Sequence, residues 1–323
     1  MHKSKATALI TVILIVAIIS ITAITMQGYL RGEIHRTQIV IDNDEIYNTL
    51  LSLEAWGLMK ITEKQKVSNT DTNAVQSVTF NKNEVNSTSK IINQNGLFNI
   101  NVLSSIKYCR FSEVSPKQAL ISKIFTNLIL NLKDNNLTIE QINKIITSIQ
   151  EWVCTRNSAE QNITVTDPRW EYQKAGQIFT DISELKLVPG INTNTYNNLK
   201  DKITALPVLG DNGAIFDIDA MLPEVFVALA YTDLNTAKQF LEEIKNISKS
   251  EKMTAVLNYL KNTNKYSEQE MGSLKDLIAL VDDQEKFYSI NSIATKHDFR
   301  MDLTSLVTVT NNEPRVIWRK RGT

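Results

Sequence analysis

LITVILIVAII, at residues 9–19, lies inside an uncharged run that extends from Ala6 to Leu30. A helix rises about 1.5 Å per residue, so about 20 apolar residues cross the hydrocarbon core of a bilayer, and this run is long enough. Charged or titratable residues flank it on both sides, namely His2, Lys3 and Lys5 before it and Arg31 and Glu33 after it. Positive charge on the short N-terminal side predicts a cytoplasmic N-terminus, with everything after Arg31 exported.

Two kinds of segment have such a composition, a cleaved signal peptide and a permanent membrane anchor. A signal peptide has an apolar core of only about 7–15 residues before a small-x-small cleavage site, whereas this longer run leads directly into Gln27–Arg31. A permanent anchor fits better, because apolar residues recur at helical spacing through residues 31–65 without a proline. We therefore predict one helix, with residues 7–30 in the membrane and residues 31–65 as its amphipathic periplasmic continuation.

A short basic leader, a small residue and an apolar helix that continues into an amphipathic one resemble the layout of type IV pilin-like proteins. Lys3–Ala6 corresponds to the end of the leader, residues 1–6, and Thr7 to the first mature residue. The resemblance implies a single-pass protein of the inner membrane. It also implies that a prepilin peptidase cuts between Ala6 and Thr7 and that the new N-terminus is methylated. The chain departs from the family in having Ala6 where Gly is usual.

The fifth mature residue is Thr11, where most pilins have Glu. A charged N-terminal amine inside lipid needs a counter-charge, which the Glu of a neighbouring subunit supplies. A subunit without that carboxylate suits the end of a filament. The alternative is that Thr11 is merely a tolerated lipid-facing residue, and the sequence alone leaves both interpretations open.

Three later segments resemble the minor pseudopilin GspK family of type II secretion systems. Gly96–Leu103, GLFNINVL, resembles that family's Gly-x-Phe-Asn-Leu-Asn-x-Leu segment, and Ile182–Ile191, ISELKLVPGI, resembles its Ser-Glu-Leu-Arg-Leu-Val-x-Gly motif. Glu54-Ala55-Trp56 resembles part of its extended helix. The chain departs from the family at Asp217–Met221, where an Asn-Val-Asn-Thr-Ala stretch is usual, and between Trp152 and Trp170, where the family's acidic segment is not evident.

The pattern of the exported part changes twice. Residues 66–114 are rich in Asn, Ser and Thr with weak alternating strands, residues 115–281 are helical, and residues 282–323 return to strand composition. Pro116 after Ser115 and the pair Thr138 and Gln141 mark two helix starts. Further helices are expected at 192–203, 221–230, 234–247, 251–262 and 267–281, and strands at 287–290, 303–309 and 315–319. The GspK resemblance implies an α+β pilin-like fold, with a small antiparallel sheet split by a large all-α insertion.

Composition and motifs exclude several functions. Lys+Arg and Asp+Glu are 35 each, so no overall field attracts nucleic acid. Three His and two Cys are too few for a Cys/His zinc site, and no catalytic triad, phosphate loop or HExxH motif is present, so we expect no enzyme. Residues 185–191 resemble the turn of a helix-hairpin-helix, but residues 181–203 carry no basic surplus for a nucleic-acid backbone.

Three pairs of residues are candidates, one for a disulfide and two for a metal site. Cys109 and Cys154 lie in an exported, oxidising setting that favours pairing over two buried thiols. Asp217 with Asp219, and Asp167 with Glu171, offer oxygen ligands to a hard cation such as calcium, although such spacings are common and solvated surface carboxylates are the favoured interpretation. No cofactor is required by any motif, and calcium is the one ion to test.

The resemblance implies a minor pseudopilin that caps the tip of the type II secretion pseudopilus and takes part in its initiation and in protein export. The implied partners are GspI and GspJ, and further GspH, the major pseudopilin, the inner-membrane platform and the prepilin peptidase. The alternative is a membrane-anchored helix-hairpin-helix protein that binds DNA in a competence-type pilus. An anchored periplasmic enzyme is the third class, and no catalytic constellation supports it.

Overall fold

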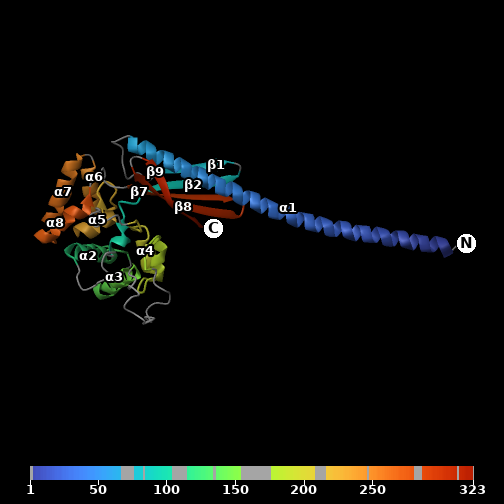
Figure 1. Cartoon of the computed structure of the whole chain (residues 1–323), viewed down its shortest axis with the longest axis horizontal. Helices are drawn as coiled ribbons and strands as arrows, with labels where there is room; N and C mark the ends of the chain where they lie inside the picture. The colour runs from blue at the N-terminus through green and yellow to red at the C-terminus, as the bar shows by residue number, and fades with distance from the viewer. Residues whose placement is uncertain are drawn as a thin grey trace, which may run out of the picture.

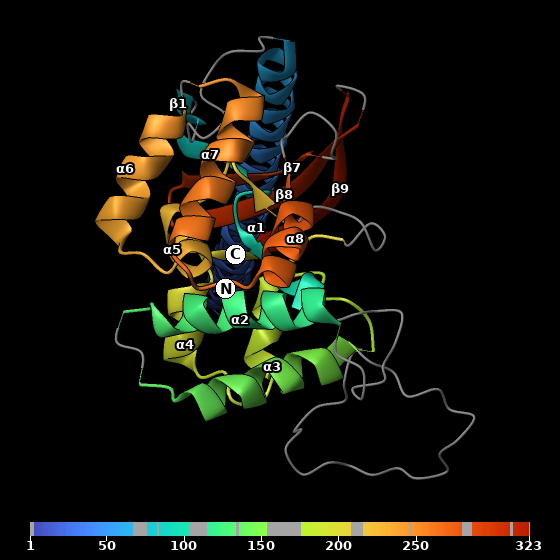
Figure 2. The same cartoon turned by 90° about the vertical axis from the view of Figure 1, so that its left-hand side faces the viewer.

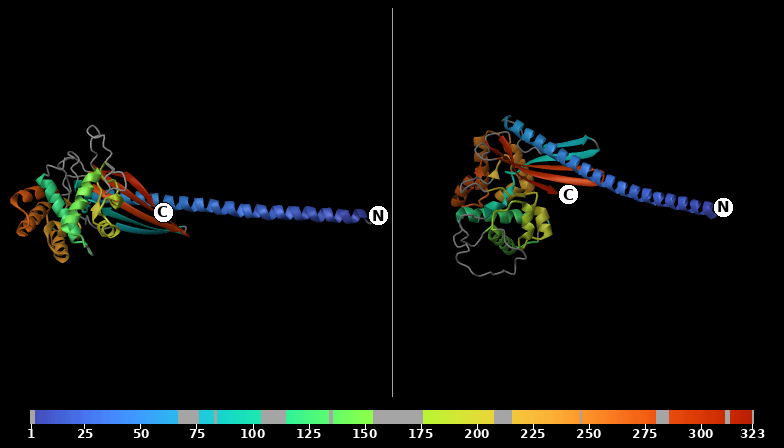
Figure 3. Two further views of the ribbon diagram at one scale, coloured as in Figure 1. Left: turned by 90° about the horizontal axis from the view of Figure 1, so that it is seen from below. Right: turned by 45° about the vertical axis from the view of Figure 1, so that its right-hand side comes forward.

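The computed structural model combines a long helix, an antiparallel sheet and a cluster of shorter helices (Figure 1). It describes residues 3–66, 76–82, 84–103, 115–133, 136–153, 176–207, 216–245, 247–279, 286–310 and 313–322. The helix projects from the folded head at one end, and the shorter helices lie at the opposite end (Figures 1 and 3). The predicted α+β class, with its helical insertion, is confirmed.

α1 is one unbroken helix of 64 residues from Lys3 to Lys66, as the apolar and amphipathic periodicity predicted. Its last third lies across one face of the sheet, where Ile46, Leu50, Leu53 and Ile61 are buried. Gly57 lies at the contact, because a Cβ on it would be 2.6 Å from Ile290 Cδ1. The missing side chain therefore lets the helix approach the sheet closely.

The sheet has five strands in the order β1-β2-β7-β8-β9, and all neighbours are antiparallel. The strands are β1 (Gln76–Lys82), β2 (Val85–Asn93), β7 (Lys286–Lys296), β8 (Phe299–Thr310) and β9 (Glu313–Gly322). Alternate side chains of β2, such as Val85 and Ile91, point toward α1 and are buried. The C-terminal strands are longer than predicted, because the hydrogen-bond ladder continues through polar residues such as Asn291 and Ser292.

The helical insert occupies the chain between β2 and β7 (Figure 2). Its helices are α2 (Pro116–Leu130), α3 (Ile139–Val153), α4 (Thr193–Leu199), α5 (Pro223–Ala230), α6 (Leu234–Ile244), α7 (Lys249–Asn262) and α8 (Glu268–Leu277), with short 3-10 turns η1 (Ile100–Leu103) and η2 (Ile182–Leu187). Ser115 caps α2, its hydroxyl accepting from the Gln118 N–H. Thr138 and Gln141 form the reciprocal contacts of the predicted capping box at α3.

Three helix predictions extend too far: the expected helix at 234–247 ends at Ile244, and in the other two a short strand follows the helix. The expected helix at 192–203 ends at Leu199, and residues 203–204 form β4 (Ile203–Thr204), which pairs in parallel with β3 (Phe98–Asn99). The expected helix at 267–281 ends at Leu277, and Ile278–Ala279 forms β6, which pairs with β5 (Phe216–Asp217). The latter two errors have one cause: a two-residue strand is specified by its distant partner and leaves no local pattern.

Candidate assembly surface

The N-terminal part of α1 is the largest uncovered apolar surface in the described chain. From Val12 to Ile41 every residue except Glu33 and Ile39 is exposed, and the large apolar residues are mostly uncovered: Ile24 is 69% and Ile34 67% exposed. We call residues 12–41 the free half of α1 and residues 42–66 the bound half. The only segment of the described residues long and apolar enough to cross a membrane lies in this helix. A monomeric soluble protein does not expose a surface of this kind, so the free half is a surface for lipid or for other helices.

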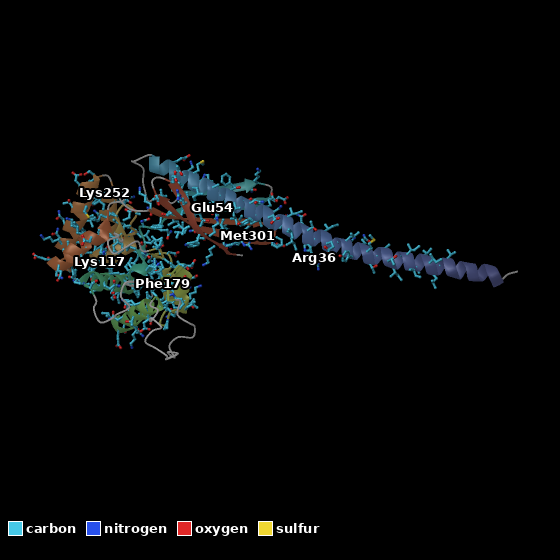
Figure 4. All side chains as sticks on the ribbon, viewed as in Figure 1. Arg36, Glu54, Lys117, Phe179, Lys252 and Met301 are labelled. Atoms are coloured by element: carbon cyan, nitrogen blue, oxygen red, sulfur yellow. The ribbon has the colours of Figure 1, made fainter. Side chains whose placement is uncertain are left out.

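Glu54 ties the bound half to the far edge of the sheet (Figure 4). Its carboxylate accepts two hydrogen bonds from the Arg319 guanidinium, both at 2.8 Å, and one from the Ser305 hydroxyl. Burial opposes ionisation of Glu54, but these donors outweigh it and hold the pKa of the carboxyl below its usual value. The ionised bridge fixes α1 over β8 and β9.

A second polar cluster holds α1 where the bound half begins. Lys296, at the end of β7, donates to Asp42 at 2.9 Å and also to Glu45. The hydrogen bond from Lys296 lowers the pKa of Asp42, and the two carboxylates raise the pKa of Lys296 to about 12. His297 follows in the next turn, and its ring nitrogens lie 3.5 Å from Asp42 and 3.3 Å from Glu84.

Sequence reasoning missed these helix–sheet ion pairs, although one signal for them exists. Asp42 and Glu54 occupy positions on the same helical stripe as the buried Ile46 and Leu50. An acidic residue on an apolar stripe needs a partner when buried, so its position alone indicates a cation across the contact. Which cation supplies the charge is decided by strand register, which the sequence does not give.

The segment Gly96–Leu103 joins distant parts of the insert. The Asn99 side chain bonds both the N–H and the carbonyl of Leu206, each at 3.1 Å. Asn101 donates to the carbonyls of Phe179 and Leu206, each at 2.9 Å, and accepts from the Phe179 N–H at 2.8 Å. Both amides are buried. The two asparagines therefore hold loops in place by satisfying backbone groups that have no partner in a helix or sheet.

The hairpin at residues 185–191 is also structural. Leu185, Val188 and Ile191 are buried in the core of the insert, and Gly190 takes the left-handed φ of 90° with Ile145 against it. The nearby charges are partnered: Lys320 binds Asp181 at 2.9 Å, Lys186 lies 4.5 Å above the Tyr196 ring, and Glu184 closes the capping box. No observation on the described residues favours the DNA-binding alternative.

Asp217 and Asp219 do not fit a calcium site. Asp217 is buried, and its carboxyl accepts from the Asp219 N–H at 2.9 Å, while Asp219 binds Lys252 at 2.8 Å. Burial, with the negative charge of Asp219, raises the pKa of Asp217 to about 7. The interpretation of Asp217 as a solvated surface carboxylate is thus wrong. Among the described residues no group of three or more His, Cys, Asp or Glu is arranged to hold a metal.

The remaining predicted site residues stay predictions. Cys109, Cys154, Asp167 and Glu171 lie outside the described residues. Ala6, Thr7 and Thr11 lie in the first turns of α1, whose side chains are not described. Processing, methylation, the disulfide and a calcium site at Asp167 and Glu171 therefore rest on the sequence.

Residues 96–208, which include Asn99, Asn101 and the hairpin, match the family model for type II secretion system (T2SS), protein K. Over these residues the chain is similar to protein K of the type II secretion system. Its fold is also similar to a chain in "The Crystal Structure of the GspK-GspI-GspJ complex from enterotoxigenic Escherichia coli Type 2 Secretion System". The TM-score is 0.67 at 17% identity, covering 89% of this chain and 99% of that one. No curated protein matches the sequence.

The match relates residues 96–208 to protein K, a component of type II secretion systems. The long apolar N-terminal helix is of the kind that anchors a single-pass pseudopilin. Asn99 and Asn101 both lie in the matched segment, and both side chains are buried and hydrogen-bonded. The motif residues at 96–103 and 182–191 thus stabilise the insert, whereas the exposed apolar surface lies on the free half of α1.

Proposed function

We propose that the chain is the minor pseudopilin at the tip of a type II secretion pseudopilus, anchored in the inner membrane with its N-terminus in the cytoplasm. The observation that carries this is the placement of the two ends: an uncovered apolar helix projects from one end of the molecule, and a wide helical domain lies at the other (Figure 3). Helices pack side by side in such a filament, and a subunit whose far end is this wide leaves no room for another to stack above it.

The free half of α1 supplies the contact with neighbouring subunits, for which GspI and GspJ are the proposed partners. The solved relative was crystallised in a complex with those two proteins. We further propose that Thr11 leaves the amine of an adjacent subunit without a counter-charge, which suits a terminal position. The protein works by assembly, initiating the pseudopilus and supporting export, and no step requires a cofactor.

Processing is the first test of this function. The full chain is expressed with an active or an inactivated prepilin peptidase, and intact mass and N-terminal sequencing are measured. We expect a chain that starts at methylated Thr7 only with the active peptidase. A chain that retains Met1 in both cases contradicts the pilin-like function and leaves a plain membrane anchor.

The partner surface is tested with matched isoleucines. Ile34 on the free half is 67% exposed, and Ile139 on α3 is 59% exposed, so Asp at either position costs little stability. We expect Ile34→Asp to reduce co-purification of GspI and GspJ with the full chain about ten-fold or more, because an unpaired charge is buried at a helix contact. Ile139→Asp should have no effect. Equal capture by both variants contradicts the assignment of the free half.

A further inference from the structure

The head consists of two parts that touch over a small area. One part is α1 with the five-stranded sheet, and the other is the helical insert. Their shared apolar cluster has Phe287, Leu306 and Trp318 from the sheet, but only Leu206 from the insert. Lys320 of β9 adds an ion pair with Asp181 and a hydrogen bond to the Ser183 hydroxyl. Interfaces of this kind leave the angle between two parts free unless specific contacts fix it.

Gln94, the first residue after β2, makes hydrogen bonds to both parts with one side chain. Its amide nitrogen donates to the Ser289 hydroxyl of β7 at 2.8 Å. Its amide oxygen accepts from the Thr204 hydroxyl of β4 at 2.9 Å. Its backbone N–H also donates to the Phe287 carbonyl at 2.8 Å, which adds one rung to the ladder between β2 and β7. Ser289 and Thr204 are both buried, so each hydroxyl depends on this partner more than a surface group would.

The next two residues, Asn95 and Gly96, contact backbone groups of both parts. Asn95 accepts the Phe287 N–H on its side chain at 2.6 Å and the Asp217 N–H on its carbonyl at 3.2 Å. Gly96 lies so close to the insert that a Cβ would be 1.6 Å from the Ala220 carbonyl oxygen. The backbone of residues 94–96 is therefore fixed in place, and this directs the Gln94 side chain toward its two hydrogen-bond partners.

We propose that Gln94 is a positioning residue that sets the angle between the helical insert and the α1–sheet part. Only an amide of this length presents a donor to the sheet and an acceptor to the insert at once. Removing it leaves both cores intact but deletes a side chain that hydrogen-bonds to a buried hydroxyl in each of the two parts. The insert then swings over a wider range about the connection at residues 94–96.

The test measures the angle directly in the full chain in detergent. Spin labels carried on p-acetylphenylalanine replace Ser52 on α1 and Lys144 on α3, both exposed, so neither cysteine is altered. Pulsed electron paramagnetic resonance gives the distribution of distances between them. We expect Gln94→Ala to broaden this distribution roughly two-fold, while circular dichroism and the melting of each part stay close to wild type.

The matched control is Gln150→Ala. Gln150 also donates its amide, to the Leu103 carbonyl at 3.0 Å, but both residues lie within the insert. Its loss removes a comparable hydrogen bond without changing the link between the parts, so the distribution should stay as in the wild type. A wild-type distribution in folded Gln94→Ala overturns the proposal. Should Gln94→Ala fail to fold, Thr204→Val removes only the insert-side bond, and an unchanged width there overturns it equally.

The consequence for secretion rests on the proposed function. A tip whose wide domain swings presents no constant surface, so Gln94→Ala should lower exoprotein release several-fold in cells whereas Gln150→Ala should not. The distance measurement needs no partner and no processing. Failure of the angle inference is thus seen in the spectra, and failure of the proposed function is seen in the mass and co-purification experiments.

Discussion

The two halves of α1 are one continuous helix with opposite surroundings. In the bound half, Leu50 and Ile61 are almost completely buried against the sheet, and the acidic Glu54 is buried with its own cation. In the free half, Leu30 and Ile24 are exposed, and Glu33 pairs only with Arg36 on the same helix. The difference shows that the apolar composition of a helix does not by itself reveal which of its residues pack against the rest of the chain. The bound half contributes to the core of the α1–sheet part, and the free half is exposed for contacts outside the chain.

Truncating one leucine in each half should separate these two roles most clearly. Leu50→Ala removes a buried side chain and is expected to lower the free energy of unfolding by about 2–5 kcal/mol. Leu30→Ala, at a residue that is 47% exposed, should change it by less than about 0.5 kcal/mol. Urea unfolding of the full chain in detergent, followed by tryptophan fluorescence, measures both. Similar losses for the two variants would show that the free half is covered within the monomer.

The pH dependence of stability should separate the α1–sheet part from the insert. Asp217 has a pKa of about 7 in the folded chain against an ordinary value of 3.8, so the folded state binds more protons between these values. Stability then falls by about 2–4 kcal/mol as pH rises from about 4 to 7, and stays level above that. Asp217→Asn should remove this slope in unfolding measured at pH 5 and pH 8.

The α1–sheet carboxylates should act with the opposite sign. Glu54 and Asp42 have pKa values below their usual range in the folded chain, so their contribution is present at neutral pH and is lost as pH falls below about 4.5. A slope between pH 5 and 8 that persists in Asp217→Asn would therefore contradict the assignment of that slope to the insert.

Removing the charge of one acidic residue in each half should have a smaller but still unequal effect. Glu54→Gln leaves Arg319 without its counter-ion and should cost about 1–3 kcal/mol, a range reduced because Arg319 is 50% exposed. Glu33→Gln breaks a solvent-exposed pair and should not alter the urea midpoint. A double variant of Glu54→Gln with Arg319→Gln that is no less stable than Glu54→Gln alone would confirm the coupling.

Enlarging a glycine in each half should give small effects of opposite sign. Gly57→Leu places a side chain where Ile290 already packs and should destabilise the head by about 1–2 kcal/mol. Gly32→Leu meets nothing within 4 Å and should stabilise the helix by about 0.5–1 kcal/mol. Thermal melting by circular dichroism checks both. A stabilising Gly57→Leu would mean that the helix does not need its close approach to β7.

Much of this architecture was predictable from local patterns. The continuous helix follows from apolar spacing without proline, and the starts of α2 and α3 follow from Ser115 and Thr138. The insertion followed from the change of period and from family motifs. The pairing of Phe98 with Ile203 was not predictable, because two-residue strands depend on register between residues that are distant in sequence.

The candidate surface was predictable in part. The sequence predicted the apolar segment at residues 7–30 and the amphipathic continuation at 31–65, whereas the start of the bound half at Asp42 depends on where Lys296 ends its strand. Asp217 was expected at the surface because its spacing to Asp219 is common, but burial is set by packing of β5 against β6 and could not be inferred from that spacing. Gln94 carried no motif signal, since its two partners lie 195 and 110 residues away in sequence.

The unbroken course of α1 into the sheet determines how the head responds to traction. A pull on the membrane end travels along the helix axis, since no hinge interrupts it before the bound half. The Asp42–Lys296 and Glu54–Arg319 bridges are spaced along that same axis. Force along the axis therefore acts parallel to the helix–sheet contact. It loads both ion pairs at the same time and does not break them one after the other. The helix–sheet contact therefore resists axial force well, because both ion pairs and the apolar contact between them must break together.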